Sequence, residues 1–141
     1  MNTKTITFTV PGVPKGQARP RFARIGNFVR TYDTKDAHSN KQNIAAFAMA
    51  AGVKPFQGPV TIAISAFLPR PQRLCRKKDN PAECPATCKP DCDNIAKAIC
   101  DALIGVAYAD DAQVWTCRIT KAYHAIGGVP RMVVTVAGEI A

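Results

Sequence analysis

Residues 89–115 read KPDCDNIAKAICDALIGVAYADDAQVW, and this stretch decides the fold because it places a helix between an extended segment and a strand. It also holds five of the protein's ten carboxylates within 21 residues. An Asp-x-Asp pair begins the cluster and two adjacent aspartates end it. Because the whole chain carries a formal charge of +9, this concentration of acids requires an explanation. The five are Asp91, Asp93, Asp101, Asp110 and Asp111.

The spacing of apolar residues predicts a helix from about residue 94 to residue 104, ended by a glycine. Side chains two apart in an extended segment point the same way, so Asp91 and Asp93 can project together before the helix. Asp93 is predicted to be the N-cap, where the helix dipole favours an ionised carboxylate. Lys97 and Asp101 follow at intervals of four and share one stripe with Asp93. The opposite stripe is predicted to be core: Ile95, Ile99, Cys100 and Leu103.

The second aspartate pair, Asp110 and Asp111, follows the helix and precedes a strand, where it could meet the first pair in space. Three or four carboxylates beside a lysine are typical of a site for a hard cation such as Mg²⁺. Carboxylates alone repel a phosphodiester, whereas a bound metal activates water and offsets charge on the phosphate. An N-cap and a polar turn are the structural alternative. With Lys97 and a basic partner half, the pattern favours metal-dependent chemistry on nucleic acid.

The distribution of charge indicates the partner. Residues 1–78 hold 14 Lys and Arg against two acids, whereas residues 79–141 hold five against eight. A basic half suits a polyanion, because each phosphate that it neutralises releases condensed counterions. A merely solubilising surface is the alternative, but it would not segregate the two signs. The side chains predicted to contact DNA are Lys15, Arg19, Arg21, Arg24 and Arg30.

Length and hydropathy predict one domain, residues 1–141, without a membrane-spanning segment. The start alternates polar and apolar residues instead of forming a signal peptide's apolar run, so we expect a cytoplasmic protein. Periodicity predicts a mixed β-sheet with two main helices, of class α/β (α+β). The expected elements are a strand at 5–10, a hairpin at 22–32, a helix at 34–51, a strand at 58–68, the helix at 94–104, and strands at 113–123 and 131–137.

The order D-x-D-N-x-x-K-x-x-x-D-A-L-x-G, followed by a connector and D-D-x-Q-V, resembles the signature of the RusA family of Holliday-junction resolvases over about residues 89–121. The resemblance implies a homodimeric endonuclease that uses Mg²⁺, with Mn²⁺ able to substitute, in a bacterial host cell, often one carrying a phage or prophage. Such enzymes nick opposed strands of a four-way DNA junction, and a twofold dimer suits paired cuts. By motif position, the catalytic metal ligands would be Asp91, Asp93 and Asp111, and the essential lysine would be Lys97.

Two other functions share part of this pattern. A nuclease for other branched DNA would use the same chemistry on a different substrate. A non-catalytic basic DNA-binding module would use the acids only to cap a helix or hold a structural ion. The complete set of three aspartates and a lysine favours an enzyme, because a binding module gains nothing from carboxylates near phosphates.

Four of the six cysteines lie in or just after residues 69–90, a segment that we call the cysteine-rich loop and that is either an ordered functional loop or a flexible one. Without a secretion signal, a disulfide framework is not expected. Four thiols match the number that a structural Zn²⁺ site uses, but the spacing is not that of common zinc knuckles, so reduced thiols are favoured. Cys100 and Cys117 are predicted to be buried in the core. The four thiols are Cys75, Cys84, Cys88 and Cys92.

Overall fold

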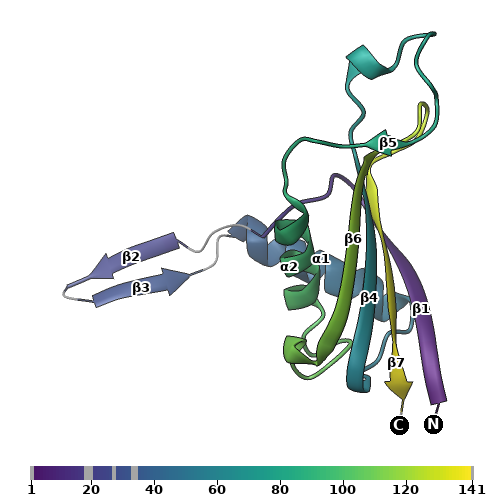
Figure 1. Ribbon diagram of the computed structural model, residues 1–141. Coiled ribbons are helices and arrows are strands. Elements are labelled where there is room, and N and C mark those ends of the chain that lie inside the picture. Colours follow the sequence, from purple (N-terminus) through teal and green to yellow (C-terminus); the bar gives the residue numbers. More distant parts are fainter. Residues whose placement is uncertain (1, 18–20, 27, 33–34, 141) are drawn as a thin grey trace.

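Four of the predicted strands form a mixed sheet together with a short fifth strand that was not predicted, and two helices lie against one face of this sheet (Figure 1). The structure is a computed structural model that describes residues 2–17, 21–26, 28–32 and 35–140. The elements are β1 (Asn2–Pro11), β2 (Arg21–Ile25), β3 (Phe28–Tyr32), α1 (Lys35–Ala50), β4 (Gln57–Leu68), the 3₁₀ turn η1 (Gln72–Leu74), β5 (Cys84–Pro85), α2 (Cys92–Ala102), the 3₁₀ turn η2 (Asp111–Gln113), β6 (Val114–Tyr123) and β7 (Arg131–Ile140).

The connections between strands determine where α2 lies. The strand order is β1-β7-β4-β6-β5, and β4 pairs with β6 in parallel while the other pairs are antiparallel. Parallel neighbours need a long crossover, and here the cysteine-rich loop and α2 supply it. The crossover therefore packs α2 on the sheet and brings η2 to the start of β6.

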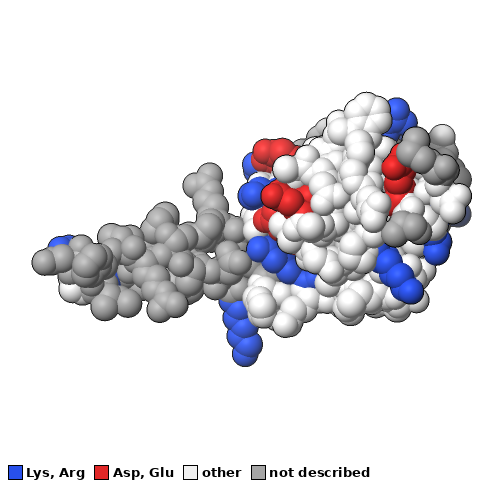
Figure 2. Space-filling model, turned by 90° about the horizontal axis from the view of Figure 1, so that it is seen from below, with Lys and Arg blue, Asp and Glu red and all other residues white. Residues whose placement is uncertain are grey.

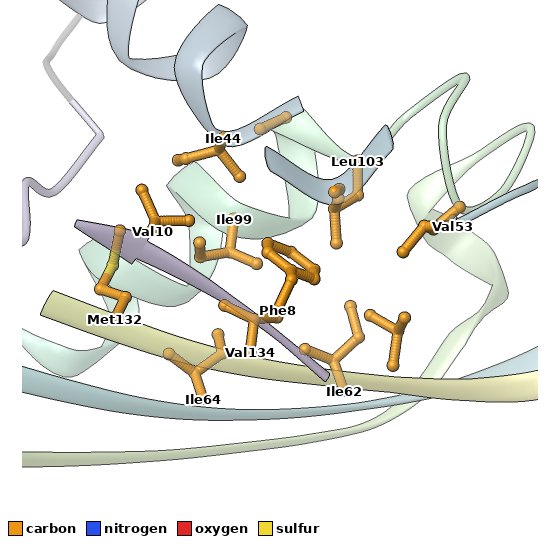
Figure 3. Packing of buried hydrophobic residues seen from close by; sticks show 14 of the residues in the cluster. Phe8, Val10, Ile44, Val53, Ile62, Ile64, Ile99, Leu103, Met132 and Val134 are labelled. Carbon is orange, nitrogen blue, oxygen red and sulfur yellow. The ribbon is translucent and has the colours of Figure 1, made fainter. Parts of the chain in front are cut away.

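The core lies between the helices and the sheet. Along β4, apolar side chains at alternate positions are buried, and β7 repeats the pattern. Figure 3 shows Ile44 of α1, Ile99 of α2 and Leu103 at the C-cap of α2 pointing toward side chains of β1, β4 and β7. The predicted apolar stripe of α2 is confirmed for Ile95, Ile99 and Leu103, none of which has exposed surface.

The two cysteines assigned to the core lie at its margin. Cys100 is only half-buried, and Cys117 is exposed, so the predicted burial of Cys117 was wrong. Cys117 pairs with Ile62 and so lies on the helix-covered side of the sheet. However, on the side of β6 away from β4 the sheet continues only with the two-residue β5. The helices do not fully cover this edge of the sheet.

The predicted hairpin and first helix are confirmed. Strands β2 and β3 pair with each other in a separate sheet, which extends away from the body of the molecule in Figure 1. Gly26 of the predicted turn has a positive φ of 60°, whereas Asn27 lies outside the described residues. Helix α1 ends before Gly52, whose φ is 90°, as expected for a glycine that stops a helix. No helix in the described ranges is long and apolar enough to cross a membrane.

The start of α2 differs from the prediction. Asp91, and not Asp93, occupies the N-cap position, with extended backbone angles of φ −71° and ψ 154°. Cys92 and Asp93 are already helical, so the N-cap prediction for Asp93 was wrong. Both aspartates are good N-cap residues by type, and local propensity alone does not select between them.

The packing of α2 should dominate the stability of the protein. We expect Ile99→Ala to lower the free energy of unfolding by about 2–5 kcal/mol, because it leaves a cavity at a fully buried site. The control is Ile104→Ala, two residues beyond the same helix, where 44% of the residue is exposed. That change should cost less than about 0.5 kcal/mol. Equal losses in urea unfolding of the two variants would contradict this assignment of the core.

Candidate functional site

The first aspartate of the Asp-x-Asp pair is held by a neighbouring lysine. Lys89 Nζ donates to both carboxylate oxygens of Asp91, at 2.9 and 2.8 Å, and Asp91 makes no side-chain capping bond to the described residues of α2. This hydrogen bond, with further attraction from Lys121, lowers the pKa of Asp91 against partial desolvation. Asp93 lies exposed in the first turn of the same helix. Asp91 therefore presents an ionised carboxylate at the positive end of α2.

The predicted stripe along α2 contains an ion-pair network. Lys97 Nζ lies 3.7 Å from Asp101 Oδ2, as expected for residues four apart on a helix. The same oxygen accepts a hydrogen bond from Gln17 Nε2 at 3.1 Å and lies 4.0 Å from Lys41 Nζ. The side chain of Asp101 is 19% exposed and that of Lys97 is 62% exposed. Asp101 thus serves as an anchor, and Lys97 extends from it toward solvent.

The two aspartates of the second pair, Asp110 and Asp111, have different structural roles. Asp110 caps η2, where its Oδ1 accepts a hydrogen bond from Ala112 N at 2.9 Å. Gln113 Oε1 accepts from the N–H groups of Ala109 and Asp110 at 3.0 and 3.3 Å. Its Nε2 donates to two carbonyls at the start of β4, at 3.3 and 3.0 Å. Asp110 and Gln113 therefore build the turn, while Asp111 is left to project from it.

Asp111 interacts with charged groups of α2 and with Asp110, the N-cap of η2. A hydrogen bond shared with Asp110, partial desolvation, and repulsion by Asp110 and Asp101 raise the pKa of Asp111, while Lys97 acts in the opposite direction. The segment after α2 thus brings Asp111 close to Asp101 and Lys97. Figure 2 shows acidic side chains gathered beside basic ones on the side of the body from which the hairpin extends. The negative charge of Asp111 is unfavourable in the metal-free protein.

The segment after β1, residues 12–17, packs directly on α2, and we call it the first basic loop. Gln17 N donates to Asn94 O at 3.0 Å, and a Cβ added to Gly16 would lie 2.9 Å from Asn94 Cβ and 3.2 Å from Pro90 Cβ. Only glycine allows this close approach without a shift of the neighbouring side chains. Neither Gly16 nor Gln17 was predicted as part of the site, because a glycine in a basic loop does not tell which helix it contacts. Lys15, the preceding residue, lines a pocket together with Ser39, Asn40 and Asn43 of α1.

The structure places some of the side chains predicted to contact DNA. Lys15 and Arg24 are exposed, and Arg24 Nε donates to a carbonyl two residues along, at 3.2 Å. Arg21 and Arg30 belong to β2 and β3, and their side chains are not among those described. Arg19 lies outside the described residues. A role of these five in DNA binding stays a prediction.

The carboxylates suit a hard cation by their chemistry. Mg²⁺ in proteins commonly binds one or two carboxylates and completes its shell with waters and substrate phosphates. Within the described ranges, no three side chains of Asp, Glu, His or Cys converge on one point. Asp91 is hydrogen-bonded to Lys89, whereas the pKa of Asp111 is raised by its hydrogen bond with Asp110, by partial desolvation and by repulsion from Asp110 and Asp101. The donor set fits an ion of this kind, and the ligand roles of Asp91, Asp93 and Asp111 remain predictions.

The thiols of the cysteine-rich loop are separate. All six cysteines of the protein are free, and no three of them lie together among the described residues. Cys75 Sγ donates to the carbonyl of Pro71 at 3.5 Å, and the carbonyl of Cys88 accepts from Lys121 Nζ. A structural zinc site on the four loop cysteines stays an untested alternative.

Comparison with known proteins identifies the class. The chain matches the family model of endodeoxyribonuclease RusA over residues 11–137. It is also 34% identical over 124 residues to the Bacillus subtilis (strain 168) protein YqaN, described as uncharacterized, an alignment that covers 84% of this chain and 87% of that protein. The chain belongs to the RusA family of endodeoxyribonucleases.

The two adjacent aspartates should respond differently to substitution. Asp110→Ala should lower the free energy of unfolding by about 0.5–2 kcal/mol, because it removes the side-chain cap of η2. Asp111→Asn should leave the stability of the metal-free protein unchanged or higher, because it removes repulsion between carboxylates. Urea unfolding at neutral pH with a chelator present measures both. A larger loss for Asp111→Asn than for Asp110→Ala would reverse the assigned roles.

The contact between the basic loop and α2 should depend on the missing side chain of Gly16. Gly16→Ala should cost about 1–3 kcal/mol of stability, because its methyl group would overlap the Cβ atom of Asn94. Lys15→Ala, at the adjacent exposed position, is the control and should cost less than about 0.5 kcal/mol. If Gly16→Ala proved as stable as the wild type, the loop would not be tightly packed on α2.

Proposed function

We propose that this protein is a metal-dependent endodeoxyribonuclease that resolves four-way DNA junctions by paired, symmetric nicks. Family membership over residues 11–137 supports the class of reaction. The observation that carries the proposal is the ion pair between Lys97 and Asp101, 3.7 Å apart on α2. Both residues lie within electrostatic range of Asp111 in the segment after that helix. Carboxylates and a lysine brought together from separate segments are the groups that phosphodiester hydrolysis with a divalent cation requires.

The cofactor in this proposal is Mg²⁺, with Mn²⁺ able to substitute, held by Asp91, Asp93 and Asp111. When bound, the ion supplies an activated water and offsets the negative charge on the phosphate. The hydrogen bond from Lys89 lowers the pKa of Asp91 below its ordinary value and so stabilises a carboxylate that is already ionised at neutral pH. The raised pKa of Asp111 reflects repulsion that a cation would relieve.

Lys97 is the residue best suited to contact the reacting phosphate. Its ammonium group is largely exposed, and Asp101 holds it from one side at 3.7 Å. A fixed positive charge stabilises the negative charge that develops on phosphate oxygens in the transition state. Asp101 acts as a positioning residue, because Gln17 and Lys41 also approach the oxygen that holds Lys97.

The proposal includes a homodimer, because cutting two opposed strands symmetrically requires two sites related by a twofold axis. DNA would contact the first basic loop and the hairpin, where Lys15 and Arg24 are exposed. The six free thiols favour a reducing compartment, in keeping with a cytoplasmic location.

The carboxylate roles can be tested by cleavage of labelled DNA. Asp91→Asn and Asp111→Asn should each abolish cleavage of a four-way junction in Mg²⁺ while leaving junction binding intact or tighter, because a negative charge near phosphates is removed. Glu139→Gln, which removes a carboxylate on β7, is the matched control and should cut at the wild-type rate. Linear duplex and flap DNA, each with and without Mg²⁺, define the preferred substrate.

The outcomes separate the competing functions. Near wild-type cleavage by either aspartate variant would refute the metal assignment. Faster cleavage of flap DNA than of the junction would make the protein a nuclease for other branched DNA. Binding of the junction without cleavage in either metal would make it a non-catalytic DNA-binding module.

A further inference from the structure

The cysteine-rich loop is organised around one buried arginine. Arg70 is only 9% exposed, and its guanidinium group donates to four backbone carbonyls. The acceptors are Leu74 O at 2.9 Å, Ala82 O at 2.8 Å, Asn80 O at 2.8 Å and His124 O at 3.3 Å. Its backbone N–H also donates to His124 Nε2 at 3.2 Å. A single side chain thus ties both limbs of the loop to the end of β6, so the loop is ordered.

Further contacts attach the loop to the sheet and to the turn after β6. β5, which lies within the loop, pairs with β6, and Ile126 N donates to Pro81 O at 3.0 Å. Ala86 packs with Leu68 and Tyr123 in a small apolar cluster apart from the main core. Lys121 Nζ donates to a carbonyl of the loop three residues before Asp91. The loop is therefore a built element that leads directly into the candidate site.

Several cations of this loop project into solvent. Arg73, Lys77 and Lys78 are exposed, and their side chains make no hydrogen bond or ion pair with any other described residue. The two acids of the loop are both engaged elsewhere. Asp79 accepts from Arg76, at 2.8 Å from its backbone N and 3.3 Å from its Nε, and Glu83 lies 3.9 Å from the guanidinium of Arg131. Three positive charges thus lie within six residues of an ordered backbone without a described acid to neutralise them.

We propose that the cysteine-rich loop is a second DNA-binding surface, in which Arg73, Lys77 and Lys78 contact backbone phosphates; this inference rests on the proposed function. Neighbouring cations repel one another in the free protein, and a polyanion removes that repulsion while releasing counterions. Because hydrogen bonds of Arg70 already order the loop, little backbone entropy is lost when DNA binds.

The position of the loop suits branched DNA. The loop extends beyond the end of the sheet at which β4 ends, whereas the hairpin of β2 and β3 extends sideways from the body (Figure 1). α2, which carries the candidate site, lies between the two. A junction has arms that diverge, so two basic surfaces facing different directions can each hold a different arm.

Salt-dependent binding tests the loop directly. The variant Lys77→Ala/Lys78→Ala is compared with Lys4→Ala/Lys54→Ala, which removes the same charge from the opposite end of the sheet. Junction binding is measured by fluorescence anisotropy between about 50 and 200 mM salt, with a chelator present to prevent cleavage. The loop variant should bind on the order of tenfold more weakly, and its slope of log K against log salt should fall by about 0.9 for each phosphate that the protein no longer neutralises. The control should keep the wild-type slope.

A loop variant with the wild-type slope, or a control with an equal reduction, would overturn the inference. Neither result would affect the proposed function if the wild-type protein cuts the junction in Mg²⁺. Conversely, a reduced slope in the loop variant of a protein that cuts no DNA would support the loop as a binding surface and reject the proposed nuclease.

A second variant tests whether the order of the loop matters. Arg70 is buried and does not face solvent, so Arg70→Met removes the anchor without removing an exposed charge. We expect new proteolytic cleavage between residues 73 and 83, and junction binding weakened to a similar extent as in Lys77→Ala/Lys78→Ala. Unchanged binding by a variant that is cut in the loop would show that an ordered loop is not required, and would overturn that part of the inference.

Discussion

The burial of the apolar stripe of α2 against the sheet is the interaction on which the candidate site depends. Ile95, Ile99 and Leu103 have no exposed surface, and burying each contributes roughly 1.5–3 kcal/mol. With this face fixed inward, the opposite face must carry Lys97 and Asp101 outward. The parallel pairing of β4 with β6 then returns the chain so that Asp111 meets that outward face.

The aspartates around α2 fall into two groups according to the interactions that they make. Asp101 and Asp110 accept hydrogen bonds from groups that hold the local structure together. Asp91 and Asp111 interact mainly with other charged side chains, and the pKa shifts of the two are opposite because lysines surround one and carboxylates the other. The negative charge of Asp111 is thus costly to the free protein, whereas that of Asp91 is stabilised.

Features that repeat along the chain could be predicted from the sequence, and contacts between distant segments could not. Alternation and helical periodicity located both helices and every strand of the main sheet except the two-residue β5, because burial of one face imposes these patterns. The D-x-D-N and D-D-x-Q motifs located the candidate site. The anchoring by Arg70 and the approach of Gly16 to Asn94 depend on segments far apart in sequence. The exposure of Cys117 likewise depends on how short its neighbour β5 is, which no local pattern shows.

The position of β7 in the sheet determines when the sheet can be completed during synthesis. The final strand lies between β1 and β4, so the first strand has no partner in the central sheet until the last ten residues of that sheet are available. Contacts between the two ends of a chain form late, because they require the largest loop to close. A chain still being synthesised therefore lacks a finished platform for α2. The acidic residues around α2 and Lys97 therefore cannot take up their final arrangement before β7 has been synthesised.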